Sequence, residues 1–329
     1  MNKLQEMPKI ELHVHLDGSM RLETASQWSK ESLDVVREKM EAPIDCVDLN
    51  NYLTKFSFPL SLLQTKDHLT RVAYELVEDL EKDHVIYAEI RFAPILHTKQ
   101  GLSLQEVVEA VLDGLKKGRI KCGLLLCLMR NEKEENNRKV IEVAKQYLGK
   151  GVVGLDLAGA EGMYPTSNFA SLFQEAQKQN IPFTIHAGEA DGPSSILSAI
   201  QFGAKRLGHG VRIIEDSSLM QLAKKQDITL EICPSSNLQT RIVTNYADHP
   251  LFALFNQGLH VTINTDNRTV SNITLTQEYQ KLKDAFPFAE EDFKAMNLYA
   301  VQASFLPEEE KQQLVEEYLL QWEQYLHIQ

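Results

Sequence analysis

The stretch Ile10-Glu11-Leu12-His13-Val14-His15-Leu16-Asp17-Gly18 alternates apolar residues with chemically active ones. It predicts a short buried strand that ends in a turn at its last two residues. Because side chains two positions apart on a strand point to the same face, His13 and His15 project together. Two imidazoles at the end of a strand can bind one divalent cation, although two histidines hydrogen-bonded inside a core would show the same spacing.

The composition is that of a soluble globular protein, with 43% hydrophobic and 24% charged residues in a chain of 329. A formal net charge of -12 would repel a nucleic-acid backbone. Residues 1–9 lack an apolar secretory core, and the longest apolar run, residues 122–129, is too short to cross a bilayer. We therefore expect neither nucleic acid nor membrane as a partner. The cysteines have no C-x-x-C spacing, which favours free thiols and a cytoplasmic location; they are Cys46, Cys122, Cys127 and Cys233.

Strand-like and helix-like segments alternate along most of the chain. After the opening strand, further strands are expected at residues 85–92, 122–129, 152–158, 182–187, 206–209, 228–233 and 259–265. Such alternation implies a parallel sheet with helices outside, and eight units indicate an α/β fold of the closed (β/α)8 TIM barrel type.

Helical sequence at both ends suggests additions to this barrel. One N-terminal helix is expected over residues 21–40, and C-terminal helices are expected from Leu275 onward. An open doubly wound sheet is the alternative, but it would show a glycine-rich phosphate turn after the first strand, and Asp17-Gly18-Ser19 is not one. With no repeat or linker in the sequence, residues 1–329 are predicted to form a single domain.

In a barrel of parallel strands, the residues at the carboxyl ends of the strands line one shared mouth. Four of the ten histidines fall at such ends. Three neutral imidazoles with one carboxylate would suit Zn2+ before Mg2+ or Ca2+, while iron or cobalt would also fit. The residues expected at the mouth are His13, His15, Asp17, Asp156, Gly159, Glu161, His186, Glu189, His209, Glu231, Ser235, Ser236, Asn237, Asn264, Thr265, Asp266 and Asn267.

Three of these residues have patterns that point to catalysis. Glu189 follows a glycine that can bend the chain back toward the mouth, where a shielded carboxyl would stay protonated and act as an acid. The alternative is a surface carboxylate that caps the following helix. His209 lies between two glycines, which leave room for its ring to approach a reacting centre. Asp266 ends a buried strand, which favours a metal ligand over a helix N-cap.

Taken together, these motifs resemble the adenosine deaminase family, from Lys9 to about Tyr279. Their order along the chain makes the resemblance specific. It implies hydrolytic deamination of adenosine, and of 2'-deoxyadenosine, to inosine and ammonia by a zinc-bound hydroxide. The motifs are His13-Val14-His15-Leu16-Asp17-Gly18, Asp156-Leu157-Ala158-Gly159, His186-Ala187-Gly188-Glu189, Leu207-Gly208-His209-Gly210, Glu231-Ile232-Cys233-Pro234 and Asn264-Thr265-Asp266.

The resemblance also implies roles for individual residues. Glu189 would protonate N1 of the purine, while His209 and Asp266 would orient the hydroxide and handle its proton. The N–H of Gly159 would bond purine N3, and Asp17 the ribose 5'-hydroxyl. One Zn2+ per chain would be held by His13, His15, His186 and Asp266. The substrate-binding residues would be His15, Asp17, Gly159 and Asn267, under a hydrophobic lid of Leu49, Tyr52, Leu53 and Phe56.

One position departs from the family pattern. Many members carry two adjacent aspartates after the last strand, and the second of them bonds purine N7, whereas here that position is Asn267. An amide can donate to N7 without first taking a proton, which a carboxylate must do. The swap therefore keeps the contact with N7 possible, and we expect its affinity and pH dependence to differ.

Several rival functions share part of this pattern. A free-base adenine deaminase tends to carry His-x-His-Leu-Glu-Gly in the first motif, where this chain has Asp17. A nucleotide substrate would require clustered Lys or Arg near the strand-end motifs. A two-metal amidohydrolase would require a lysine at a middle strand end, and a deaminase of single-stranded nucleic acid would require H-x-E with P-C-x-x-C. A silent nucleoside-binding protein would need neither Glu189 nor His209. The sequence does not indicate an oligomeric state.

Overall fold

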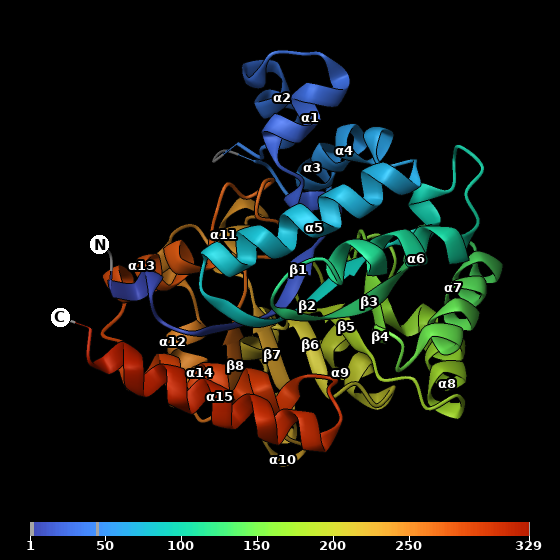
Figure 1. The fold of residues 1–329 in the computed structure, drawn as a ribbon. Coiled ribbons are helices and arrows are strands. Elements are labelled where there is room, and N and C mark those ends of the chain that lie inside the picture. Colours follow the sequence, from blue (N-terminus) through green and yellow to red (C-terminus); the bar gives the residue numbers. More distant parts are fainter. Residues whose placement is uncertain (1–2, 44–45, 329) are drawn as a thin grey trace.

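The computed structural model describes residues 3–43 and 46–328, in which eight parallel strands form the centre of the molecule (Figure 1). Most of their residues are buried, as expected for parallel strands covered on both faces. The strands are β1 Lys9–His15, β2 Val85–Phe92, β3 Lys121–Met129, β4 Val152–Ala158, β5 Thr184–Ala187, β6 Arg206–His209, β7 Thr229–Ile232 and β8 His260–Ile263.

The strands close into a barrel through two seams. Strands β1 to β4 form one sheet in sequence order and β5 to β8 form a second. At one seam the Leu155 N–H donates to the Pro182 carbonyl at 2.9 Å, which joins the start of β5 to β4. At the other, the His15 N–H donates to the Asp266 carbonyl at 2.7 Å, and the Asp266 N–H donates to the His13 carbonyl at 2.9 Å. The expected closed (β/α)8 barrel is therefore confirmed.

Helices surround the strands and cover the outside of the barrel (Figure 1). The α-helices are α1 Leu22–Ser29, α2 Leu33–Met40, α3 Leu49–Leu53, α4 Ser57–Leu62, α5 Lys66–Lys82, α6 Leu104–Leu115, α7 Glu134–Tyr147, α8 Ala170–Lys178, α9 Pro193–Gln201, α10 Ser217–Lys225, α11 Pro234–Gln239, α12 Leu251–Asn256, α13 Leu275–Ala285, α14 Glu290–Ala303 and α15 Glu308–Leu326. Short 3-10 turns lie at η1 Lys3–Gln5, η2 Asp17–Ser19, η3 Thr54–Phe56, η4 Pro94–His97, η5 Thr166–Phe169, η6 Val211–Glu215 and η7 Tyr246–Asp248.

The prediction of one N-terminal helix over residues 21–40 is wrong, because the structure has two helices, α1 and α2. Lys30 adopts a left-handed φ of 63°, and its N–H donates back to the Ser26 carbonyl, which ends α1. The Ser26 hydroxyl donates to the Glu31 carbonyl at 2.6 Å and stabilises the bend. Both helices lie on one side of the molecule, next to α3 and α4 (Figure 1). The C-terminal additions α13 to α15 form as expected, and α14 contacts β1 through Asn297, whose side-chain oxygen accepts from the Ile10 N–H.

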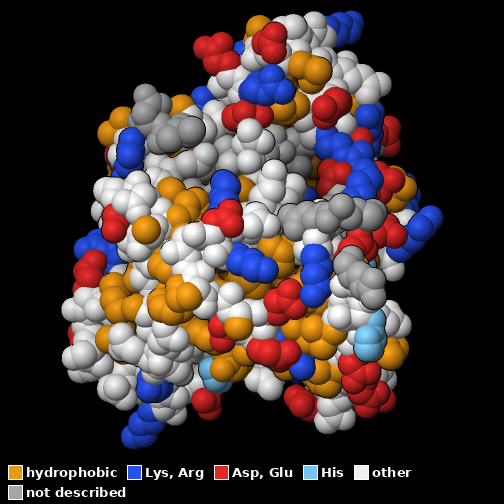
Figure 2. Space-filling model, turned by 90° about the vertical axis from the view of Figure 1, so that its left-hand side faces the viewer, with side chains coloured by type: hydrophobic (Ala, Val, Ile, Leu, Met, Phe, Trp, Pro, Cys, Tyr) orange, Lys and Arg blue, Asp and Glu red, His pale blue; other side chains and the backbone are white. Residues whose placement is uncertain are grey.

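Acidic and basic side chains are interspersed on the face shown in Figure 2, among orange apolar side chains. This face therefore carries no large area of basic side chains alone. Among the helices of the described ranges, none is both long and apolar enough to cross a lipid bilayer. All four cysteines are unpaired thiols, as expected.

Candidate active site

The carboxyl ends of β1, β5 and β8 bring four side chains together. We call His13, His15, His186 and Asp266 the His3Asp cluster, and their ligand atoms all lie within 4.8 Å of one another. Asp266 Oδ1 lies 3.4 Å from Nε2 of both His13 and His15. The Nε2 atoms of His15 and His186 are 3.3 Å apart. Residues separated by up to 253 positions in the chain thus meet because the barrel closes between β8 and β1.

Two buried carboxylates orient rings of this cluster. Nδ1 of His13 lies 3.0 Å from Glu231 Oε2, and Nδ1 of His186 lies 2.9 Å from Asp156 Oδ2. Each carboxylate accepts a hydrogen bond from the Nδ1–H of its histidine. The lone pair on Nε2 of each ring is therefore directed at the cluster. Among the described residues, the buried His13 Nε2 has no hydrogen-bond partner.

Glu189 and His209 lie beside the cluster, and burial favours the neutral form of each. Burial raises the pKa of Glu189 well above its usual range, and the charges of Asp266 and Glu161 add to this effect. Burial lowers the pKa of His209 well below its usual range. The two side chains approach to 3.5 Å, between His209 Nε2 and Glu189 Oε2. Both shifts favour a protonated Glu189 beside an uncharged His209 over an ion pair between them.

The alternative in which Glu189 is a surface carboxylate is wrong. Only 4% of the residue is exposed, and the N-cap of the following helix α9 is Gly192. Asp266 is likewise 4% exposed, with a positive φ of 60°. Burial opposes its ionisation, but the contacts with His13 and with the other histidines keep the pKa of Asp266 below its usual range.

An inner cavity of about 410 Å3 opens onto this cluster. Gly159 contributes its backbone with a φ of 105°, and burial raises the pKa of Asp17 to about 6. Gly18 is required for close packing, since a Cβ there would lie 1.9 Å from Asn267 Oδ1. Of the residues to which the resemblance gives a catalytic, substrate-binding or metal-binding role, His13 does not line this cavity. The others line it: His15, Asp17, Gly159, His186, Glu189, His209, Asp266 and Asn267.

The family model described as adenosine deaminase matches residues 8–319. An adenosine deaminase of Clostridium perfringens is 42% identical over 328 residues, covering 94% of this chain and 98% of that protein.

The chain belongs to the adenosine deaminase family. The family and the enzyme class expected from the sequence, a deaminase, are thereby confirmed.

Solved structures of more distant relatives have the same fold. An adenine deaminase of Arthrobacter aurescens superimposes with a TM-score of 0.87 at 26% identity, covering 95% of this chain and 98% of that one. The N6-methyl-AMP deaminase of Arabidopsis thaliana gives a TM-score of 0.85 at 28% identity, covering 96% of this chain and 97% of that one. The fold is therefore shared by deaminases of a free base and of a nucleotide.

In this adenosine deaminase family member, an arginine that sequence reasoning missed joins the two orienting carboxylates. Arg91, on β2, donates to Asp156 at 3.2 Å and to Glu231 at 2.8 Å. All three side chains are fully buried, where a charge is tolerated only when it is paired. Arg206 donates to the other oxygen of Glu231 at 2.6 Å. The available signal was two charged residues, Glu89 and Arg91, inside a strand that is otherwise largely apolar, since a buried charge must find a partner.

Glu161 was expected at the mouth without a role, and the structure shows it holding the loop that carries Glu189. It is fully buried and accepts four successive backbone N–H groups, from Gly188, Glu189, Ala190 and Asp191, at 2.7–3.0 Å. Successive N–H groups that converge on one anion form a rigid nest. The position of the Glu189 backbone is therefore determined by a carboxylate from the loop after β4.

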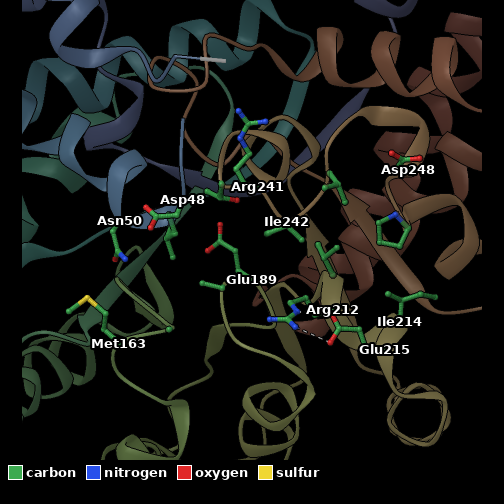
Figure 3. Close-up of a pocket in the computed structure, with 17 residues that line it drawn as sticks. Asp48, Asn50, Met163, Glu189, Arg212, Ile214, Glu215, Arg241, Ile242 and Asp248 are labelled. Carbon is green, nitrogen blue, oxygen red and sulfur yellow. Dashed lines mark hydrogen bonds and ion pairs between the residues drawn. The ribbon is translucent and has the colours of Figure 1, made fainter. Parts of the chain in front are cut away.

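A second, outer cavity of about 840 Å3 adjoins the inner one and shares Leu49, Met163 and Glu189 with it. Figure 3 shows the Glu189 carboxyl projecting into this space. Two arginines, which were not expected here, line it. Arg212 is paired with Glu215 at 2.7 Å, and Arg241 Nε donates to the Cys46 carbonyl at 2.7 Å. Both are therefore engaged by the protein itself.

The lid predicted from the sequence corresponds to α3, η3 and α4. Leu49, Tyr52, Leu53 and Phe56 all line the inner cavity, as does Leu60. A buried polar contact also joins the lid to the barrel, since the Tyr52 hydroxyl lies 2.8 Å from Ser271 Oγ. The segment thus covers the cavity through apolar contact.

Proposed function

We propose that this chain hydrolyses adenosine, and 2'-deoxyadenosine, to inosine and ammonia, with one Zn2+ bound per chain. One observation carries the proposal: the His3Asp cluster and the neutral Glu189 face the same inner cavity. A purine placed there would meet a metal centre and a proton donor at the same time. Because the two sheets join at both seams into one closed barrel, we further propose that residues 1–329 act as a single catalytic domain.

The residues present suit a zinc ion. Three Nε2 lone pairs and one carboxylate converge, and the buried Nε2 of His13 has no other partner among the described residues. The Nε2 atoms of His15 and His186, 3.3 Å apart, would repel unless a cation or a proton lay near them. Imidazole nitrogen with one carboxylate oxygen is a donor set typical of catalytic zinc. When bound, such an ion supplies a water of lowered pKa at neutral pH.

The remaining roles belong to residues of the chain. Glu189, held neutral by burial, would donate its proton to purine N1 and make C6 more electrophilic. The Gly159 N–H would donate to purine N3, and Asp17 would accept from the ribose 5'-hydroxyl. His15 would line the same cavity beside the substrate. Because Oδ1 of Asn267 packs against Gly18, its NH2 is the end available to donate to N7. Apolar lid residues would exclude water from the purine ring.

The test is an ultraviolet assay of the purified chain with adenosine, 2'-deoxyadenosine, adenine and AMP, together with a determination of bound metal. We expect turnover of the two nucleosides, its loss on chelation and its recovery with Zn2+. A folded, zinc-loaded preparation that leaves all four compounds unchanged would contradict the proposal. Turnover of adenine or AMP alone would transfer the assignment to that substrate.

Substrate choice can be traced to one side chain. Asp17→Ala removes the acceptor assigned to the 5'-hydroxyl, so kcat/KM for adenosine should fall by roughly tenfold or more, the equivalent of a hydrogen bond to a charged group. Adenine, which has no ribose, provides the internal control wherever its turnover is measurable, and 5'-deoxyadenosine provides it otherwise. Equal losses for substrates with and without the hydroxyl would remove the ribose assignment.

A further inference from the structure

A chain of hydrogen bonds enters the site from the segment before α12. The Leu251 N–H donates to Nδ1 of His249 at 3.1 Å, and Nε2 of His249 lies 3.2 Å from Asn237 Oδ1. Asn237 Nδ2 in turn lies 3.0 Å from Nδ1 of His209. His209, Asn237 and His249 are at most 2% exposed, so bulk water does not compete for these contacts.

The first member gives the chain its direction, because a backbone N–H can only donate. Nδ1 of His249 must therefore be an unprotonated acceptor, and the single hydrogen of the neutral ring lies on Nε2. Burial lowers the pKa of His249 to about 3, which keeps the ring neutral at physiological pH. Its Nε2–H then donates to Asn237 Oδ1. The opposite amide orientation would place an NH2 group against an N–H, so the NH2 of Asn237 faces His209.

We infer that this chain holds His209 in the tautomer with its hydrogen on Nε2, so that His209 donates a hydrogen bond to the reacting oxygen and does not remove its proton. Nδ1 of His209 is occupied as an acceptor, and a hydrogen there would face the NH2 of Asn237. The Nε2 side lies 3.5 Å from Glu189 Oε2, so the donated hydrogen points into the inner cavity. Asn237 and His249 are positioning residues that act through His209.

The identity of the reacting oxygen rests on the proposed function, whereas the tautomer is a property of the folded chain. It can be measured on zinc-loaded protein labelled with 15N-histidine, because two-bond 1H–15N spectra distinguish the two tautomers. The His209 signal is identified by its absence in His209→Gln. We expect the Nε2–H form. An Nδ1–H form in the wild-type chain would overturn the inference without any assay of turnover.

The near-isosteric change Asn237→Asp should reverse the tautomer. A carboxylate can only accept hydrogen bonds. One of its oxygens would accept from the Nε2–H of His249, and the other would require a hydrogen on Nδ1 of His209. A wrong histidine tautomer lowers kcat about 10⁴-fold in the serine protease triad, so we expect a loss of roughly 10²–10⁴ with zinc content retained. Unchanged kcat in a variant whose spectrum shows the reversed tautomer would refute the donor role.

His249 offers an independent pair of variants. His249→Gln can still donate an N–H to Asn237, whereas His249→Phe cannot, so Gln should retain more of kcat and a larger share of the Nε2–H signal. Equal kcat and equal spectra for the two would count against the chain. Asn297→Asp changes another buried amide, on α14, and should leave the His209 signal unaltered.

The two proposals fail separately. Absence of adenosine turnover in the wild-type chain would contradict the proposed function, while an Nδ1–H signal in an active chain would contradict only the tautomer.

Discussion

The base of the site and its lid are built on opposite physical principles. At the base, Arg91, Asp156 and Glu231 are fully buried, and charge-assisted hydrogen bonds link them to the rings of His13 and His186. In the lid, α3 to α4, the side chains that cover the cavity are apolar, and several remain partly exposed. Each side chain at the base is oriented by its hydrogen-bond partner. The lid is instead held in place by the area of its apolar contacts.

This difference separates chemistry from coverage. Hydrogen bonds in a low-dielectric interior are directional, so they can hold a metal ligand or a proton donor to within a fraction of an ångström. Apolar contacts have little directional preference, so they can part and close again around a substrate at small cost. We therefore expect changes at the base to alter kcat or metal affinity, and changes in the lid to alter KM. The following variants test that division, from the largest expected effect to the smallest.

Glu189→Gln should produce the largest loss that leaves the metal in place. The amide has nearly the same shape but cannot donate a proton as the carboxylic acid does, and a positioned acid commonly contributes about 10²–10⁴ in rate. We expect kcat to fall by that factor while zinc content and inosine binding are retained. Near-normal turnover by this variant would show that the proton comes from elsewhere.

Arg91→Met should weaken metal binding by about 10–100-fold, the usual range when a group supporting the metal ligands is lost. Without the guanidinium, Asp156 and Glu231 become uncompensated buried carboxylates and their hold on the two histidines loosens. Zinc affinity is measured by competition with a chelator, alongside thermal unfolding. Arg212→Met is the control, since Arg212 pairs with Glu215 at the outer cavity, and it should leave zinc affinity unchanged.

Phe56→Ala should raise KM by about five- to tenfold, the equivalent of about 1–1.4 kcal/mol of apolar contact with the purine ring. kcat and zinc affinity should stay within twofold of the wild type, because the lid has no part in orienting the cluster. Phe58→Ala lies in the same segment but does not line the inner cavity, so it reports any general loosening of the lid. A kcat loss larger than the KM effect in Phe56→Ala would erase the division between lid and base.

Glu161→Gln should shift the pH profile. The charge of Glu161 helps to raise the pKa of Glu189, so its removal lowers that pKa. Glu189 works in its protonated form, and activity is therefore lost as pH rises through its pKa. The alkaline limb of kcat/KM should accordingly move to lower pH in the variant. Glu75→Gln, a buried carboxylate change on α5 whose partners are Thr24 and Arg71, should leave the limb where it is.

Much of the architecture could be predicted because its signals are local. Alternation in the opening stretch placed His13 and His15 on one face, and the succession of strand and helix patterns identified the barrel. The single helix expected over residues 21–40 failed at Lys30, where a left-handed residue ends α1 without a glycine or proline to mark the stop. A lysine carries little information about such a φ value, so the break could not be foreseen.

The sequence by itself determined which strand ends carry ligands, acids and amides, because side-chain direction on a strand follows from a period of two. Only the tertiary structure decided which of these groups meet. The pairing of Arg91 with Asp156 and Glu231, the nest around Glu161, and the path from Leu251 to His209 join residues whose separation along the chain leaves no periodic trace. Their partners are selected by closure of the barrel, which converts distance in sequence into contact and buries charges that must then be paired.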